Sequence, residues 1–206
     1  MSAQIVSMQQ VDKIYVNGEE KTYALQGMNL TLHQGEFAAL CGPSGSGKTT
    51  ALNLIGILDT PSAGAITVDG KDLGALSKSQ QAAMRKERIG FIFQAYNLVP
   101  VLSVYENAEF VLMLKGVPPK ERREKVMAIL EIVGMADKAD RRPHQLSGGQ
   151  QQRVAIARAV AGEPALVLAD EPTANVDSRT AGGLLDLMER LNGEHGVTFL
   201  FSTHDP

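Results

Sequence analysis

The segment that most constrains the fold is a glycine-rich loop between an apolar run and a helical pattern. The apolar run covers residues 37–41, the loop covers 42–50, and apolar residues recur at helical spacing over 51–58. The loop fits the pattern G-x-x-x-x-G-K-[ST], whose fixed places hold Gly42, Gly47, Lys48 and Thr49. The segment therefore predicts a strand, a phosphate-binding loop and a helix, in that order.

The residue types of this loop suit a phosphate group. Glycines let the backbone turn tightly, so that successive N–H groups point at one anion, and the helix N-terminus adds partial positive charge. We expect Lys48 to reach the β- and γ-phosphates and the Thr49 hydroxyl to take a position on Mg²⁺. The alternative is a turn that merely joins two elements, and the lysine, the hydroxyl and the flanking elements disfavour it.

Composition narrows the class of protein. With 206 residues, of which 44% are hydrophobic, the chain can bury a substantial core as one domain or two closely joined lobes. The formal net charge of -3 lacks the basic excess of nucleic-acid binders, so no nucleic-acid partner is expected. The one cysteine, Cys41, allows no disulfide framework and is expected to be a small core residue in a reducing compartment.

No targeting or membrane segment is indicated. Residues 1–10 have neither a basic nor an apolar signal region, and no later stretch reaches the ~18 apolar residues of a membrane span. We therefore expect a soluble, cytoplasmic chain.

The segments on either side of the loop alternate between strand and helix patterns. Short strands are predicted over 5–34, broken at Asn17-Gly18, and an edge hairpin is predicted over 65–73. A helical pattern over 77–87 precedes a buried strand over 89–93, which ends on Gln94.

From residue 95 to about 160 the pattern is helical and contains no strand. A capping box at 103–106 opens a helix through about Lys115, and a second helix starts at Pro118-Pro119 and ends near Gly134. A charged, exposed linker is predicted over 136–143. A further loop-then-helix begins at Ser147-Gly148-Gly149-Gln150 and is a second potential anion site, although this signal alone is weak.

The last part of the chain returns to strands. An apolar run over 166–169 ends in Asp170 and Glu171, an amphipathic helix is predicted over 179–195, and a strand over 197–201 leads to His204. Strands that alternate with helices favour a largely parallel sheet. The predicted fold class is α/β, with a mostly parallel sheet, an N-terminal antiparallel β portion and an inserted helical lobe.

Polar side chains at strand ends are the candidates for chemistry, because open α/β sheets bind ligands there. Asp170 is expected to complete the shell of Mg²⁺, and Glu171, which points differently along the strand, to act as base or to position water. His204 and Gln94 could hydrogen-bond a γ-phosphate and the water or metal. The alternatives are an acidic pair that caps a solvated turn and polar side chains with purely structural partners.

These motifs occur in a specific order: the loop at 42–50, Gln94, Leu146-Ser147-Gly148-Gly149-Gln150, the run 166–171, Asp177 and His204. In this order they resemble the nucleotide-binding domains of ABC transporters, a P-loop NTPase fold, over essentially the whole chain. Finer stretches, such as 54–59, 90–94 and 169–173, resemble the lipoprotein-releasing and macrolide-export ATPases.

The resemblance implies a head-to-tail dimer with two Mg-ATP molecules at its interface. Each site would pair the phosphate loop of one copy with residues 147–150 of the other. The residues that this resemblance places on ATP are Tyr15, Gly42, Ser44, Gly45, Ser46, Gly47, Lys48, Thr49, Thr50, Ser147, Gly148, Gly149, Gln150 and Asp177.

The same resemblance implies a role for each residue. Glu171 would be the general base, and Lys48 and His204 would contact the γ-phosphate. Thr49, Gln94 and Asp170 would serve Mg²⁺. Tyr15 would stack on adenine, although spacing alone favours half-buried sheet surface, and Asp177 would couple the two sites.

The implied partner is an integral membrane permease subunit. Residues 96–102 and the helix after Ser103 would form the groove for its cytoplasmic coupling helix; the alternative for this apolar patch is packing between lobes. The implied organisation is one nucleotide-binding domain over 1–206, with an ATP-binding core at 1–94 and 161–206 and a helical lobe at 95–160. The family continues with further helix and strand, so we expect a truncated C-terminus.

Three classes of function are consistent with a phosphate loop. The first is a transport ATPase at the cytoplasmic face of the cell (inner) membrane, for export or lipoprotein release. The second is a soluble nucleotide-dependent clamp of the ABC type, and the third is a phosphotransfer kinase. Residues 146–150 disfavour the kinase. Ala174 and Val176 depart from the Gly and Leu that the lipoprotein-releasing and macrolide-export ATPases commonly have at these positions.

Overall fold

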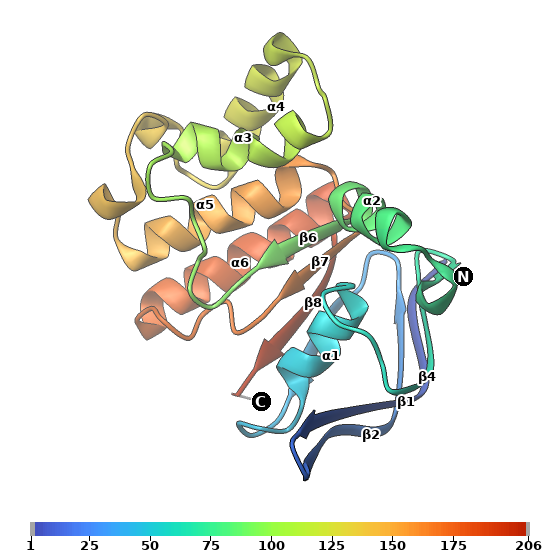
Figure 1. The fold of residues 1–206 in the computed structure, drawn as a ribbon. Coiled ribbons are helices and arrows are strands. Elements are labelled where there is room, and N and C mark those ends of the chain that lie inside the picture. Colours follow the sequence, from blue (N-terminus) through green and yellow to red (C-terminus); the bar gives the residue numbers. More distant parts are fainter. Residues whose placement is uncertain (1–2, 205–206) are drawn as a thin grey trace.

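The computed structural model describes residues 3–204 and contains two four-stranded sheets (Figure 1). The first sheet is antiparallel, with the order β2-β1-β4-β5. Its strands are β1 (Gln4–Asn17), β2 (Glu20–His33), β4 (Ala63–Val68) and β5 (Lys71–Asp72). This sheet confirms the predicted antiparallel portion near the N-terminus and places the predicted hairpin at its edge.

The β1–β2 hairpin corrects the prediction of short strands. Each strand has 14 residues, and the turn between them contains Gly18 at a φ of 63°. Register shifts occur between Met8 and Lys13, and Gln10 has a φ of 47°. Such bulges add a residue to one strand, so the alternation of apolar and polar residues slips while the pairing continues.

The second sheet is parallel, as predicted, with the order β3-β8-β7-β6. Its strands are β3 (Phe37–Cys41), β6 (Ile89–Ile92), β7 (Leu166–Ala169) and β8 (Thr198–Thr203). Because all four strands run in one direction, the residues that follow them gather at a single edge of the sheet. That edge carries the phosphate loop.

Cys41 corrects a second prediction. The thiol was expected in the core, and it is exposed. In the described part of the chain β3 pairs only with β8, so it forms an edge of the parallel sheet. An edge strand has a neighbouring strand on one side only, and its last residue therefore stays in contact with solvent.

Helix α1 (Lys48–Ile55) lies between the two sheets (Figure 1). Its Leu54 and Ile55 belong to a core cluster that also contains Val6 of β1 and Leu168 of β7. Successive strand residues face opposite sides of a sheet, so Leu168 faces α1 and its neighbour Val167 faces away. This packing fixes α1, and with it the phosphate loop, against the parallel sheet.

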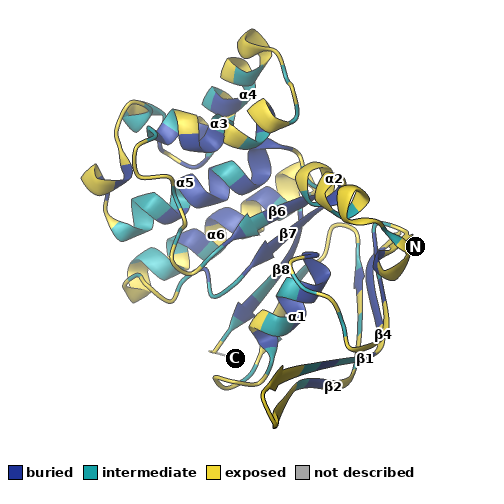
Figure 2. Ribbon diagram, in the orientation of Figure 1, coloured by how far each residue is buried: buried dark blue, intermediate teal, exposed yellow. Residues whose placement is uncertain are grey.

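The other face of the parallel sheet is covered by helices (Figure 2). Val167 and Phe199 pack there with buried residues of α5 and α6. Helices α3 (Val104–Leu114), α4 (Pro119–Ile132), α5 (Gly148–Ala161) and α6 (Ser178–His195) contribute to this cluster, whereas Met84 of α2 (Lys78–Arg88) belongs to the cluster around α1. The 3-10 turns lie at Leu73–Ala75, Ala136–Lys138 and Pro143–Gln145.

The region that the sequence predicts as helical is helical. Helix α3 begins within the predicted capping box. Ser103 Oγ accepts from the Glu106 N–H, and the Glu106 carboxylate accepts from the Ser103 N–H. Within residues 3–204 no helix is both long and apolar enough to cross a membrane.

Candidate functional site

The loop between β3 and α1 has the geometry of an anion cradle. Gly45 and Gly47 have φ values of 78° and 91°, in the left-handed region that favours glycine. At Gly47 a Cβ atom would also stand 2.4 Å from the Ala24 carbonyl oxygen and 2.7 Å from Leu25 Cδ2. Only glycine therefore fits both the turn and the contact with β2 at this position.

The N-terminus of α1 is free of a side-chain cap. Gly47 is its N-cap residue and offers no side chain to the first backbone N–H groups. Those N–H groups need acceptors, and an anion at the helix start supplies them while interacting favourably with the helix dipole. Lys48 Nζ is held over the loop by the carbonyl oxygens of Gly42 at 2.6 Å and Pro43 at 3.0 Å.

Two oxygen groups meet beside this helix start. The Thr49 hydroxyl donates to Asp170 Oδ1 over 3.0 Å, and the Ser202 hydroxyl donates to the same oxygen over 2.7 Å. A hydroxyl and a carboxylate are the hard oxygen ligands that Mg²⁺ prefers. Thr49 and Asp170 are thus in place to hold such a cation together with phosphate oxygens.

The backbone at Glu171 leaves the extended conformation of the strand. The strand β7 ends at Ala169, and Glu171 has a φ of 47°, so the predicted reason for its different direction, alternation along the strand, is wrong. The Glu171 N–H donates to Ser202 Oγ over 2.9 Å. Because Ser202 also donates to Asp170, this fully buried hydroxyl holds both acidic residues in their places. Sequence reasoning missed Ser202, whose only signal is its place at the end of β8.

His204 lies between the acidic residue and the loop. Its Nε2 contacts Glu171 Oε1, and its Nδ1 lies 3.3 Å from both Lys48 Nζ and the Gly42 carbonyl oxygen. An ionised carboxylate only accepts, so Nε2 carries the proton. In the neutral ring Nδ1 is then left to accept from Lys48.

A cavity of about 220 Å³ joins these groups. Its lining contains residues of the loop together with Glu171 and His204, whereas Tyr15 and Gln94 lie outside it. Tyr23 of β2 faces the loop instead, a position that sequence reasoning did not single out. The lining residues are Thr22, Tyr23, Ala24, Ser44, Gly45, Ser46, Gly47, Lys48, Thr49, Thr50, Glu171 and His204.

Gln94 follows β6 at the same edge of the sheet, and it is exposed. Its carbonyl oxygen accepts from Asn175 Nδ2 over 2.8 Å, and the Tyr96 hydroxyl donates to the Asn175 carbonyl oxygen over 3.2 Å. Asn175 therefore connects the segment after β6 to the segment after β7. The Gln94 backbone is positioned by this contact, whereas its amide faces solvent.

The segment at 147–150 opens α5 and does not line the phosphate-loop cavity of its own chain. Ser147 caps the helix by accepting from the Gln150 N–H, and Gln150 accepts in return from the Ser147 N–H. Both glycines lie close to side chains: a Cβ on Gly148 would stand 2.7 Å from the Tyr96 hydroxyl, and one on Gly149 would stand 2.4 Å from Thr180 Cγ2.

Asp177 caps α6. Its Oδ1 accepts from the Thr180 N–H over 3.0 Å and its Oδ2 accepts from the Thr180 hydroxyl over 2.7 Å. These hydrogen bonds, that of the hydroxyl first, hold the pKa of Asp177 below its ordinary value. Because Thr180 also touches Gly149, the start of α6 is built against the start of α5.

Comparison with known proteins identifies the family in which this arrangement of residues occurs. A family model described as ABC transporter matches residues 25–174, which include the phosphate loop, residues 147–150 and the two carboxylates. The chain belongs to the ABC transporter family. The fold of this ABC domain also matches a solved structure of the family, the dimeric ATP-binding cassette MJ0796 of Methanocaldococcus jannaschii bound to ADP and Pi after hydrolysis. The TM-score is 0.89 and the identity 43%, covering 98% of this chain and 88% of that chain.

Two curated relatives fall in the predicted subgroup. The lipoprotein-releasing system ATP-binding protein LolD of Pseudomonas fluorescens is 43% identical over 201 residues, which are 98% of this chain and 88% of the relative. The macrolide export ATP-binding/permease protein MacB of Syntrophobacter fumaroxidans is 46% identical over 204 residues, which are 98% of this chain but 28% of the relative. These matches confirm the predicted family, and this ABC domain is an ATPase.

Proposed function

We propose that this chain is the ATP-hydrolysing subunit of a membrane exporter or lipoprotein-releasing system. The observation that carries the proposal is the meeting of Lys48, Thr49, Asp170, Glu171 and His204 at one edge of the parallel sheet. All of 1–206 then acts as one nucleotide-binding domain, in which residues 95–160 form the helical lobe and the rest forms the ATP-binding core.

In this proposal the triphosphate lies on the loop at 42–50. The uncapped N–H groups of α1 and the Lys48 ammonium bind its terminal phosphates, with the side chains of Ser44, Ser46 and Thr50 beside it. Thr49 and Asp170 would hold Mg²⁺, which would neutralise charge on the phosphates, and Gln94, which follows β6, would turn its amide toward the cation. No cluster of three acidic, His or Cys side chains that could hold a metal occurs among residues 3–204, which suits a cation that arrives with its phosphate ligands.

Hydrolysis needs a base for the attacking water, and Glu171 is the proposed one. In the structure its carboxylate is paired with His204. When a γ-phosphate is present, His204 turns from Glu171 to donate to a phosphate oxygen, and the freed carboxylate accepts a proton from water. Such base catalysis contributes typically about 10²–10⁴-fold to the rate.

The proposed working form is a head-to-tail dimer of two copies. Because residues 147–150 do not line the cavity of their own chain, the N–H groups of Gly148 and Gly149 and the Ser147 hydroxyl proton are available to the γ-phosphate of the other copy. Each charge-assisted hydrogen bond of this kind contributes roughly 1.5–3 kcal/mol. Loss of the γ-phosphate would therefore weaken the closed dimer. Asp177, at the start of α6, would couple this change to the second ATP site.

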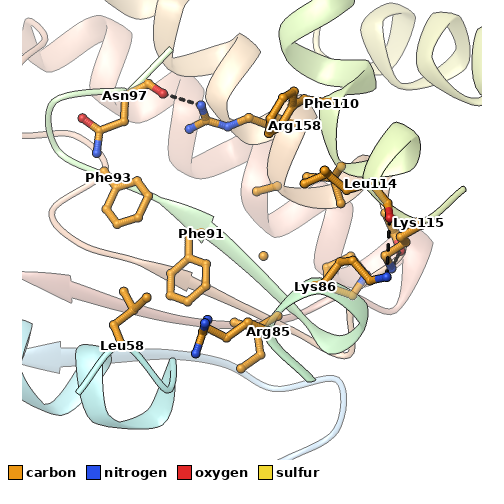
Figure 3. Close-up of a pocket in the computed structure, with 16 residues that line it drawn as sticks. Leu58, Arg85, Lys86, Phe91, Phe93, Asn97, Phe110, Leu114, Lys115 and Arg158 are labelled. Carbon is orange, nitrogen blue, oxygen red and sulfur yellow. Dashed lines mark hydrogen bonds between the residues drawn. The ribbon is translucent and has the colours of Figure 1, made fainter. Parts of the chain in front are cut away.

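The proposed contact for the membrane partner is a cavity of about 340 Å³ next to α3 (Figure 3). Phe91 and Phe93 stack at 5.7 Å between ring centroids on one side, and Phe110 and Leu114 of α3 lie on the other. Leu58 also lines the space, and about half of its surface is exposed. An apolar cavity of this kind suits a short amphipathic segment.

The charges of this cavity indicate the chemistry of that segment. Its lining contains Arg85, Lys86, Lys115 and Arg158 and no acidic residue. Arg158 donates to the Asn97 and Tyr96 carbonyl oxygens, and burial lowers its pKa. Lys115 donates to the Gly162 carbonyl oxygen over 2.6 Å. Lys86 and Lys115 also lie 3.2 Å and 3.7 Å from the Glu87 carboxylate. A partner segment with apolar residues would therefore complement the rings, and a carboxylate on it would compete with Glu87 for these lysines.

The chain would then lie at the cytoplasmic face of the cell membrane, held there by the permease subunit. The test is affinity purification of the tagged protein from gently solubilised membranes of its own host. Recovery of a subunit with a few spans and a large extracytoplasmic domain supports export or lipoprotein release. A many-span permease contradicts the subgroup, and a soluble complex without membrane protein supports the nucleotide-dependent clamp instead.

The cavity is tested by a matched pair of substitutions on α3. Leu114→Asp places a carboxylate in the lining, whereas Met113→Asp changes the adjacent residue, which is similarly exposed but does not line the cavity. We expect the first variant to lose the membrane partner and the second to retain it, with ATP hydrolysis by the isolated domain intact in both. Equal recovery of the partner would contradict this docking site.

A further inference from the structure

A cluster of three side chains joins the β1–β2 hairpin to the segment that follows α1. Lys13 Nζ lies 2.6 Å from Asp59 Oδ1 and donates to the Thr60 carbonyl oxygen over 2.8 Å. The Tyr15 hydroxyl donates to the other oxygen, Asp59 Oδ2, over 2.9 Å. The two residues of β1 are thus held by the two oxygens of one carboxylate.

Lys13 is almost fully buried, which is unusual for a lysine on a hairpin near the surface. Its ammonium also lies over the Tyr15 ring, 4.8 Å from the ring centroid. The cation therefore covers one face of the ring. Tyr15 itself is 42% exposed, so part of the side chain is open to a ligand.

The cluster is charge-balanced and closely hydrogen-bonded. Burial, the largest single influence, acts to raise the pKa of Asp59, but the hydrogen bonds from Lys13, the Thr60 N–H and Tyr15 hold it below its ordinary value. Burial and then the bond to Asp59 raise the pKa of Tyr15. The phenol therefore stays protonated and keeps its donor role.

We propose that Asp59 is a positioning residue for nucleotide binding, which fixes the Tyr15 ring as the platform for the base. The proposal rests on the proposed function and on the resemblance to the family, which implies that adenine stacks on Tyr15. Asp59 follows the helix that opens at the phosphate loop, and Tyr15 belongs to the hairpin, so their bond sets the distance between the base platform and the phosphate site. The carboxylate itself touches neither the base nor the phosphates.

Two ligands separate a role at the base from a role in the loop. ADP carries the base, and inorganic tripolyphosphate carries only phosphates. Binding of each to the full chain is measured by calorimetry for the parent, Tyr15→Ala, Tyr15→Phe and Asp59→Asn. Asp69→Asn is the matched control, because Asp69 forms an ion pair of the same length, with Arg88, and its side chain is equally exposed.

We expect Tyr15→Phe, which removes only the hydroxyl, and Asp59→Asn each to weaken ADP binding about three- to tenfold, the scale of one lost hydrogen bond. Tripolyphosphate binding stays unchanged in both, and Asp69→Asn changes neither ligand. The amide of Asp59→Asn keeps a single acceptor oxygen, which the buried Lys13 ammonium takes, so the Tyr15 hydroxyl loses its acceptor. The double variant therefore binds ADP no more weakly than the worse single variant, since both changes remove the bond of this hydroxyl.

The outcomes distinguish two failures. If Tyr15→Ala leaves ADP binding intact, Tyr15 is not the base platform, and the role that the resemblance implies for it is wrong, while the proposed ATPase function stands. If Tyr15→Ala weakens ADP binding but Tyr15→Phe and Asp59→Asn do not, the positioning role of Asp59 is overturned. A parallel loss of tripolyphosphate binding in Asp59→Asn would also overturn it, because Asp59 would then act on the phosphate loop.

Discussion

The Thr49 hydroxyl donates to Asp170 Oδ1 over 3.0 Å, although 121 positions separate the two residues in the chain. The contact brings the first turn of α1 to the end of β7. It places a hydroxyl and a carboxylate oxygen, both of the type that binds Mg²⁺, side by side. The role of the Thr49 hydroxyl can be tested without disturbing the fold, because valine lacks the hydroxyl and has nearly the same size as threonine.

Thr49→Val is expected to weaken Mg²⁺-dependent ATP binding about tenfold or more, while binding of ATP in the presence of a chelator changes little. The physical reason is the loss of one oxygen ligand from a cation that demands a complete shell. Thr49→Ser retains the hydroxyl and serves as the control. Nucleotide titrations with and without Mg²⁺ measure the effect, and an unchanged Mg²⁺ dependence in Thr49→Val would contradict the assignment.

Glu171→Gln is expected to retain ATP and to lose turnover by about 10²–10⁴-fold. The amide keeps the size of the side chain but cannot accept a proton from water. An ATP-bound dimer should then accumulate, visible by size-exclusion chromatography, while phosphate release stops. Hydrolysis at the parental rate would show that another group is the base.

Ser147→Arg, made in the Glu171→Gln background, is expected to block the dimer while ATP binding to the single copy persists. Part of its effect is local, since losing a serine cap costs a helix about 1 kcal/mol. Ser77→Arg is the matched control, because Ser77 caps α2 through the same Ser and Gln pair. Dimers that persist in Ser147→Arg, or that disappear equally in Ser77→Arg, would argue against the proposed site across the interface.

Gly149→Ala is expected to destabilise the domain by about 1–3 kcal/mol, because its Cβ would stand 2.4 Å from Thr180 Cγ2. Thr180→Ser removes that methyl group and keeps the hydroxyl that donates to Asp177. Thermal unfolding of the two single variants and the double variant measures the coupling. We expect the serine to restore most of the loss; purely additive effects would mean that the glycine is required for another reason.

The pH dependence of the free energy of unfolding should show the contribution of the charge on Asp59. Its pKa is lowered in the folded state, so the group contributes stability above its unfolded value of about 3.9 and loses that contribution as the pH falls through its folded pKa. Thermal unfolding of the parent and of Asp59→Asn is compared from pH 7 to pH 3. The difference between them should shrink below about pH 4, and a constant difference would show that the charge of Asp59 does not stabilise the fold.

Local patterns in the sequence determined much of this protein. The phosphate loop, the capping boxes at Ser103 and Ser147, and the strand that ends before Asp170 all depend on residues a few positions apart. Signals of this range are written in the chain itself: helical spacing, turn glycines and hydroxyl caps. The alternation of strands and helices also predicted a parallel sheet, and with it a shared edge for the strand ends.

Other features depended on the order of the strands, which no local pattern contains. Because β8 lies between β3 and β7, Ser202 bonds to both acidic residues and His204 reaches Lys48, 156 positions away. The same order leaves β3 at an edge and exposes Cys41. The partner of Tyr15 was equally hidden, since Asp59 becomes its neighbour only when the hairpin packs beside α1. Strand order follows from which apolar faces pack together across the whole chain, and that is decided only in the tertiary structure.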